Sequence, residues 1–257
     1  MKKSLFLFVL LTTISICVSS QPLSKVDKDF TYTFVSDEGT NASAVVWHPK
    51  KKLYFTVIAG NADFPIEAFD ENGKSVYSEP IKIDCRGMWY NSKTKNIEVN
   101  GYSRSGWAKV VLNDKLNFHE LNIIHKGMNQ YNDNSCGTYY SKKKAVIFLN
   151  YEELCIDVYN YKDPDKISKI ILKLRADNLD PYNYTTIGYT GKKGYEFVLL
   201  NVDKNALEFF NSKGEYAGST ALPKSVIVPE TFRFSFTNER VFIYDVDSRT
   251  WTAYKVF

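Results

Sequence analysis

The sequence predicts an all-β fold assembled from repeated four-stranded units, and three observations carry this prediction. Aromatic residues make up 15% of the 257 residues and stand among abundant Val, Ile and Thr, which favour strands over helices. An aromatic residue recurs at intervals of 43, 50, 49 and 47 residues, each time between an apolar stretch and a short polar turn. The segments FDENG, from Phe69, and FNSKG, from Phe210, repeat 141 residues apart, which is three steps of 47.

The first twenty residues predict a secretory signal peptide. Two lysines precede an apolar run at 5–11, and Val18 and Ser20 occupy the −3 and −1 positions of a cut after Ser20. A lipoprotein anchor at Cys17 is the alternative, and the bulky Ile16 disfavours it. The apolar run is shorter than the ~20 residues that cross a bilayer. We therefore expect a secreted protein, extracellular or periplasmic, with no membrane span.

The recurring aromatic residues define the repeat. They are Trp47, Tyr90, Tyr140, Tyr189 and Phe236. A period in the forties with about four short strands per unit is typical of a β-propeller blade. In the second unit, the strands are predicted at 86–90, 96–100, 108–112 and 118–124.

The two ends of the chain complete one blade. The last unit, which starts at Thr231, has only three candidate strands, and an additional strand is predicted at 29–35. Pairing them closes the ring and removes exposed sheet edges. We therefore predict a five-bladed β-propeller over residues 21–257, closed by an N-terminal strand, with paired β-sandwiches as the alternative. The chain resembles secreted β-propeller repeat proteins in period and pattern only, which implies a fold and no activity.

A polar residue stands six positions before each aligned aromatic. These residues are Asn41, Asp84, Asn134, Asn183 and Glu230. In a propeller this position lies where one blade crosses to the next, so we expect the five side chains to form a ring at one end of the axial channel. Asn and Asp often cap turns through their own backbone. The alternative hypothesis is a ring that binds a polar ligand or Ca²⁺, and Arg86 and Arg233 would then neutralise its acids or clamp an anionic group.

The turns after each second strand are predicted on the same face, and several carry aromatic residues. They include Phe64, Tyr102, Trp107 and Tyr151. Trp107 is the strongest candidate for ligand contact, because Gly106 and polar residues flank it. Trp47, Trp89 and Trp251 fall within strand patterns and are predicted in the core.

The net charge of +4 is modest, and the basic residues are scattered among acids, so we expect no nucleic-acid partner. The lysine runs HPKKKL and SKKKAV are predicted to be exposed turns. His48, His119 and His125 are not at metal-ligand spacing, which predicts no metal centre of that type and no cofactor.

The function predicted is therefore non-catalytic binding of a glycan or polypeptide at the ring-bearing face. A glycoside hydrolase that uses Asp84 and Glu230 is the first alternative, although these residues belong to non-neighbouring blades. A structural component of the envelope or extracellular matrix, with a protein partner, is the second.

Three cysteines follow the signal peptide, so one thiol at least remains unpaired: Cys85, Cys136 and Cys155. Cys85 stands five residues before its aligned aromatic, and Cys136 stands four before its own. Successive side chains of a strand point to opposite faces of the sheet, so two residues that differ by one position in this count, on the inner strands of neighbouring blades, point either toward each other or apart. The sequence therefore leaves open a disulfide between Cys85 and Cys136 or three buried free thiols, whereas Cys155 is predicted buried and free.

Overall fold

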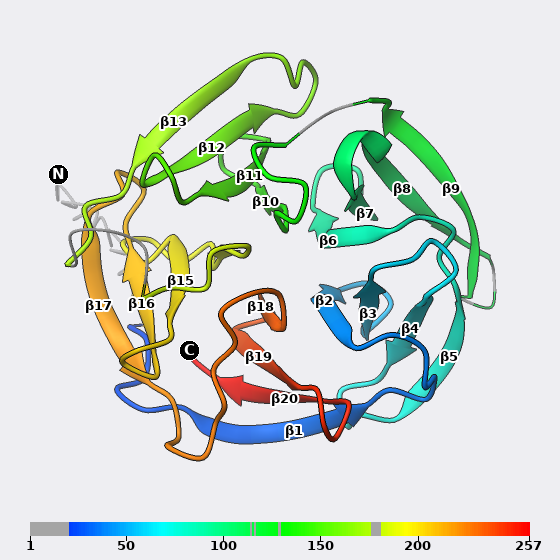
Figure 1. Cartoon of the computed structure of the whole chain (residues 1–257), viewed down its shortest axis with the longest axis horizontal. Coiled ribbons are helices and arrows are strands. Elements are labelled where there is room, and N and C mark those ends of the chain that lie inside the picture. Colours follow the sequence, from blue (N-terminus) through cyan, green and yellow to red (C-terminus); the bar gives the residue numbers. More distant parts are fainter. Residues whose placement is uncertain (1–20, 114, 116, 128–129, 176–180) are drawn as a thin grey trace, which may run out of the picture.

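The computed structural model describes residues 21–113, 115, 117–127, 130–175 and 181–257, and the predicted signal peptide at 1–20 lies outside them. Five four-stranded sheets stand around one axis as the blades of a β-propeller (Figure 1). The predicted five-bladed propeller is confirmed, and the sandwich alternative is wrong. No helix in the described residues is long and apolar enough to cross a bilayer.

Each blade runs from an inner strand at the axis to an outer strand at the rim. Blade 1 comprises β2 (Asn41–His48), β3 (Leu53–Ala59), β4 (Pro65–Phe69) and β5 (Ser75–Pro80). Blade 2 comprises β6 (Cys85–Asn91), β7 (Asn96–Gly101), β8 (Trp107–Leu112) and β9 (Phe118–His125), with the short helix η1 (Ser103–Ser105) between β7 and β8. Blade 3 comprises β10 (Thr138–Tyr140), β11 (Ala145–Asn150), β12 (Cys155–Asn160) and β13 (Ile167–Ile171). Blade 4 comprises β14 (Gly188–Tyr189), β15 (Phe197–Asn201), β16 (Ala206–Phe210) and β17 (Tyr216–Ala221). The strands predicted for blade 2 agree with these bounds to within one residue at each end.

Blade 5 joins the two ends of the chain. It comprises β18 (Phe234–Thr237), β19 (Arg240–Asp245), β20 (Thr250–Lys255) and, outermost, β1 (Asp27–Thr33). Strand β1 runs antiparallel to β20, with Asp27 opposite Lys255 and Thr33 opposite Thr250. Figure 1 shows β1, in blue, beside the red C-terminal strand. The predicted closure by an N-terminal strand is therefore confirmed.

The hydrophobic core is divided into five clusters, one between each pair of adjacent blades. This division follows from strand geometry, because successive side chains point to opposite faces of a sheet and each face meets a different blade. Ala44 and Val46 on β2 pack toward blade 2, for example, whereas Val45 packs toward blade 5. The blades are therefore held together by apolar side chains of both faces.

Buried acids tie the second and third strands of blades together. Asp157 on β12 accepts a hydrogen bond from Asn150 Nδ2 at 3.0 Å, and Glu208 on β16 accepts one from Asn201 Nδ2 at 3.3 Å. In both pairs an asparagine at the end of a strand contacts an acid seven residues later. Buried carboxylates need such partners, so we assign these pairs to the scaffold.

All three described cysteines are free and buried. Cys85 packs in the cluster between blades 1 and 2, on the side of blade 2 that faces away from blade 3. Its sulfur lies 3.3 Å from the carbonyl oxygen of Gly87. Of the two alternatives for Cys85 and Cys136, the structure therefore shows the free thiols. Burial raises the pKa of Cys136 and of Cys155 to about 12.

Candidate functional site

The five side chains predicted to form a ring lie where expected along the chain but in different environments. Asn41 is the first residue of β2, and Asp84, Asn134, Asn183 and Glu230 lie in the crossovers that precede the other inner strands. Asn41, Asn134 and Glu230 are exposed, Asp84 is half-buried and Asn183 is fully buried. These five side chains therefore do not present one uniform ring of oxygens to solvent.

Asn183 caps a turn. Its Nδ2 donates hydrogen bonds to the carbonyl oxygens of Pro229 at 2.9 Å and Phe232 at 3.0 Å. Its Oδ1 accepts from the backbone N–H groups of Thr185 at 3.3 Å and Thr186 at 3.2 Å. Both ends of the amide are occupied by the crossover, so the turn-capping interpretation holds at this position.

Asp84 and Arg86 form the ion pair that the sequence predicted, with Nη2 and Oδ2 2.9 Å apart. Asp84 Oδ1 also accepts the Gly60 N–H at 2.7 Å. The guanidinium of Arg86 lies 4.5 Å from the ring centroid of Tyr102 and 5.7 Å from that of Phe232. Phe232 belongs to the crossover into blade 5, so this contact with blade 2 spans the channel. The ring-bearing end of the channel is therefore covered by buried side chains.

The second carboxylate of the ring lies in a separate recess. Glu230 and Arg233 line a cavity of about 370 Å³ that does not include Asp84. The hydrolase alternative requires two carboxyl groups on either side of one bond, and this cavity does not bring Asp84 and Glu230 together. Among the described residues, no group of three His, Cys, Asp or Glu side chains is arranged to hold a metal ion.

The backbone beside this recess is left-handed at two successive residues, with φ of 45° at Phe232 and 54° at Arg233. Hydrogen bonds from neighbouring blades hold it, from Arg233 N–H to the Ala42 carbonyl at 2.9 Å and from Phe232 N–H to Thr185 Oγ1 at 2.7 Å. Two residues of this type in sequence are costly unless surrounding contacts fix them. The segment that covers the channel is therefore held rigidly against blades 4 and 1.

Trp107 does not lie at the surface, so the prediction of an exposed ligand contact is wrong. Its side chain is 0% exposed and meets Trp89 edge-on, with ring centroids 5.8 Å apart. Phe148 and Tyr159 of blade 3 complete its surroundings. The flanking Gly106 and polar residues indicated a turn, but Trp107 opens β8 and points to the next blade, which local sequence does not reveal.

The other aromatic residues of these turns and strands divide between surface and core. Tyr102 is 41% exposed, whereas Phe64 and Tyr151 are partly buried against core clusters. Trp89 and Trp251 are buried, as predicted. Trp47 is partly exposed and packs against the core cluster between blades 5 and 1, with its ring centroid 4.6 Å from that of Tyr54, so its assignment to the core holds in part.

The axial channel contains a cavity of about 510 Å³. Runs of consecutive residues line it: 43–47, 88–90, 136–139, 186–192 and 234–239. Side chains of a strand alternate between two faces, so lining by consecutive residues means that the backbone edges of the inner strands form the wall. Pro49, Ser92 and Ser141, in the turns after three inner strands, also line the cavity. Its mouth therefore lies on the face opposite to the predicted ring.

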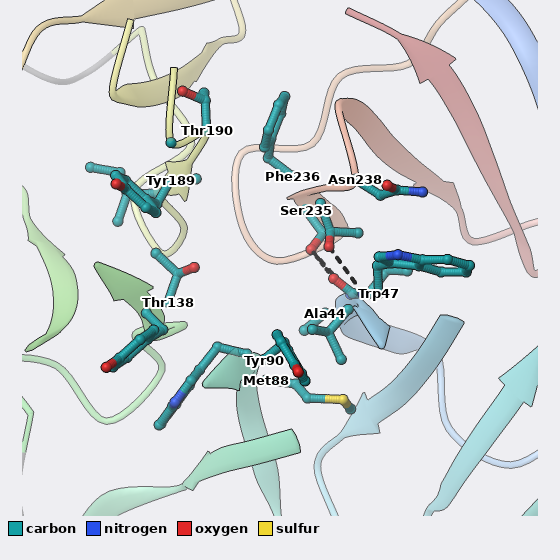
Figure 2. Close-up of a pocket in the computed structure, with 18 of the residues that line it drawn as sticks. Ala44, Trp47, Met88, Tyr90, Thr138, Tyr189, Thr190, Ser235, Phe236 and Asn238 are labelled. Carbon is teal, nitrogen blue, oxygen red and sulfur yellow. Dashed lines mark hydrogen bonds between the residues drawn. The ribbon is translucent and has the colours of Figure 1, made fainter. Parts of the chain in front are cut away.

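The wall of the cavity combines apolar side chains with hydroxyl groups and is almost uncharged. Hydroxyl groups come from four blades: Ser43, Thr138, Thr186 and Ser235. The charged residues that line it are Lys192 and Glu239, which pair with each other at the mouth. Figure 2 shows Thr138, Tyr189 and Ser235 placed around this space. In blade 1 the free edge is already bonded, because Val45 N–H donates to Ser235 Oγ at 3.1 Å and its carbonyl accepts from the same hydroxyl at 2.8 Å.

None of these four hydroxyl residues was predicted from the sequence as part of a site. Ser43, Thr138, Thr186 and Ser235 stand four, two, three and one positions before their aligned aromatics, so they share no register. The available signal was the presence of small hydroxyl residues in the predicted inner strands. That signal is weak, because Ser and Thr also occur in strands that bind nothing.

Fold and cavity together define a five-bladed β-propeller with an axial cavity that opens on one face. The structure of glutaminyl cyclase from Myxococcus xanthus is similar, with a TM-score of 0.60 and 10% identity over 92% of this chain and 98% of that one. A protein of unknown function from Bacteroides thetaiotaomicron gives a TM-score of 0.53 and 8% identity over 93% of this chain and 74% of its own. A gluconolactonase from Xanthomonas campestris gives a TM-score of 0.46 and 9% identity over 94% of this chain and 99% of its own. No protein-family model and no curated protein matches the sequence. At these identities the similarity shows the fold alone.

Proposed function

We propose that the protein is a secreted, non-catalytic binding protein that holds one end or one branch of a glycan in the axial cavity. The observation that carries the proposal is the cavity wall, in which inner-strand edges and hydroxyl side chains stand beside apolar groups and the charged residues are confined to the mouth. The edge of blade 1 is bonded to Ser235, so the edges of the other blades are the ones offered to a ligand. Its volume of about 510 Å³ falls within the roughly 300–1,000 Å³ of small-ligand pockets.

The chemistry of this wall matches a ligand rich in hydroxyl groups. A free strand edge offers N–H donors and C=O acceptors in alternation, and Thr138 and Thr186 add groups that both donate and accept. A sugar hydroxyl likewise donates and accepts. An extended polypeptide is the second candidate ligand, because a peptide strand can pair with an exposed sheet edge.

The proposal places the ligand on the face opposite to the one that the sequence indicated. Arg86 and Phe232 cover the channel at the ring-bearing end, whereas the turns leave the other end open. Glycoside hydrolysis of this type requires two carboxyl groups. Among the described residues that line the cavity, Glu239 is the one with a carboxylate, and it is paired with Lys192. The wall thus favours binding over glycoside cleavage.

A substitution that fills the cavity tests the proposal. Thr138 lies at the cavity on inner strand β10 (Figure 2), so Thr138→Phe should occupy ligand space. We expect about a tenfold or greater loss of affinity, measured by calorimetry with the best neutral oligosaccharide from a glycan array. Thr33→Phe, on the exposed outermost strand, is the matched control and should bind normally.

Thermal melts of both variants report whether the fold is retained. Unchanged glycan binding by folded Thr138→Phe would remove the axial cavity as the site. Cleaved oligosaccharide in mass spectra after incubation with the native protein would instead support the hydrolase alternative.

A further inference from the structure

Lysine-rich turns stand at the mouth of the axial cavity in three successive blades. The turns at 49–52, 92–95 and 141–144 follow the inner strands β2, β6 and β10, and one residue of each lines the cavity. Together they contain eight lysines and no acid. The predicted exposure of the lysine runs is confirmed, but their basic residues are not scattered in space. The propeller brings them onto one face.

Most of this charge has no internal partner. Among the described residues, Lys142 is the one lysine of these three turns within salt-bridge distance of a carboxylate, 3.4 Å from Glu196. The remaining seven are exposed. Like charges held close together on one surface repel each other and attract an anionic ligand.

A recess between blades 1 and 2 concentrates this charge. It has a volume of about 260 Å³ and is lined by Lys50 and Lys51 of the first turn, Lys95 of the second turn, and Lys109 of β8. No acid lines it. Four lysines that line one small recess make it a favourable place for a group with negative charge.

A buried polar group with no partner lies in the same recess. His48, the last residue of β2, lines the recess and is 5% exposed. Its Nδ1 has no hydrogen-bond partner among the described residues. Buried polar atoms are normally paired, so this nitrogen offers a bonding position to a ligand in the recess. Burial, followed by the nearby Lys51, lowers the pKa of His48.

The recess and the axial cavity share a wall. His48 lines the recess and Tyr90 lines the cavity, and their ring centroids are 5.0 Å apart. Pro49 lines the cavity and the next residue, Lys50, lines the recess. A chain of sugar units that leaves the cavity over Pro49 therefore reaches the lysines within a short distance.

We infer that the glycan is acidic, and that the recess formed by His48, Lys50, Lys51, Lys95 and Lys109 binds a sulfate or carboxylate group of the same polysaccharide whose neutral unit occupies the axial cavity. This inference rests on the proposed function for the cavity and adds an anion subsite beside it. Sulfate esters and uronate carboxylates share the chemistry that the recess selects, a compact oxyanion that accepts hydrogen bonds.

Anionic membranes and nucleic acids present similar negatively charged groups, and the structure favours neither as the partner. A membrane-binding face usually inserts apolar side chains, and none of the exposed large hydrophobic residues lies in these turns. Nucleic-acid strands are held by aromatic side chains on which bases stack. Here Tyr90 and Tyr189 stand at the cavity and the turns themselves carry no aromatic residue.

Binding of defined polysaccharides to the mature protein tests the inference. The probes are heparin as a sulfated polymer, polygalacturonate as a carboxylated one and dextran as a neutral one. We expect an acidic polymer to bind better than dextran, with affinity that falls as salt rises. The double substitution Lys51→Gln/Lys95→Gln should weaken acidic binding about tenfold at low salt. Lys93→Gln/Lys144→Gln removes the same charge from exposed positions that do not line the recess, and should cost less than threefold.

Ring signals of His48 in NMR spectra provide a second measurement. An acidic oligosaccharide should shift them and leave those of the exposed His119 in place. Equal losses in the two double variants, or unmoved His48 signals at saturation, would overturn the recess as a site. Tight binding of only oligothymidylate or of phosphatidylserine vesicles would assign the face to another class of partner. If the protein binds neutral and acidic glycans equally well, the acidic recess is refuted and the proposed function of the axial cavity stands. If Thr138→Phe still binds acidic glycans with native affinity, the axial cavity is refuted as a site and the recess stands.

Discussion

One buried carboxylate contributes to the closure of the propeller, and removing a single hydroxyl group tests that contribution. Glu67 on β4 is 0% exposed and accepts four hydrogen bonds. Tyr32 of β1 donates its hydroxyl to Oε2, Val35 N–H lies 3.0 Å from the same oxygen, and Ser36 N–H and Ser78 Oγ lie 2.8 Å from Oε1. Three of these four donors belong to the N-terminal segment, so Glu67 attaches that segment of blade 5 to blade 1.

Tyr32→Phe keeps the ring, which stacks on Phe69 with centroids 4.0 Å apart, and removes only the hydroxyl. A hydrogen bond to a charged group contributes about 1.5–3 kcal/mol, and losing it leaves the carboxylate less well paired in a buried site. For a chain of this size, the loss corresponds to a fall in melting temperature of roughly 3–12 °C. The variant should therefore be measurably less stable although no apolar contact is lost.

Tyr244→Phe is the matched control in the same blade. Its hydroxyl is buried and has no hydrogen-bond partner among the described residues, so its removal should be neutral or stabilising. Urea and thermal unfolding of both variants, followed by circular dichroism, give the comparison. Equal stability of Tyr32→Phe and Tyr244→Phe would show that Glu67 does not hold the closing strand, and the account of closure would then rest on strand pairing alone.

Two further predictions concern the closing strand and the thiols. Deleting 21–35 removes Val26, Tyr32 and Phe34 from the core, roughly 5–9 kcal/mol of burial, so we expect unfolding or aggregation, and a monomer of unchanged melting temperature would contradict the closure. The three thiols should react with a thiol reagent only after unfolding, and a Cys85–Cys136 linkage in a non-reduced digest would contradict the free thiols. Burial raises the pKa of Cys136 and Cys155 to about 12 in the folded state, whereas thiols of the unfolded chain lose their protons from pH ~8.5 upward. The free energy of unfolding should therefore fall as pH rises from ~8.5 toward 12.

The blade pattern was predictable from sequence because it rests on local chemistry. Trp47, Tyr90 and Phe236 are each the second-last residue of an inner strand and stand just before a tight turn. The apolar run and the turn residues that mark them lie within a few positions of each other in the sequence. Closure was predictable by counting strands, since blade 5 lacked one and the segment at 29–35 had no partner. Neither argument needed knowledge of which side chains meet across blades.

The candidate site was less predictable because it depends on contacts between blades. The same crossover position gives an exposed side chain at Asn134 and a fully buried one at Asn183, since the turn around Asn183 folds over its amide. Trp107 met every local criterion for exposure and is buried against blade 3. The recess at His48 joins residues from two turns and from β8, which no single stretch of sequence brings together.

The basic face is not a by-product of turn geometry, and the fold itself shows why. The turn after each inner strand requires left-handed backbone, and Lys52, Lys95 and Lys144 supply it with φ of 53°, 61° and 53°. For a residue with a side chain this conformation costs about 1–2 kcal/mol, whereas Gly and Asn adopt it readily. Blade 4 makes its turn with Gly191 and Gly194, whereas blade 5 uses Asn238 and Glu239, with φ of 50° and 62°. Glycine, asparagine and glutamate therefore make the equivalent turns of blades 4 and 5, so the fold does not require lysine at this position. Of the three left-handed lysines, Lys95 lines the proposed recess.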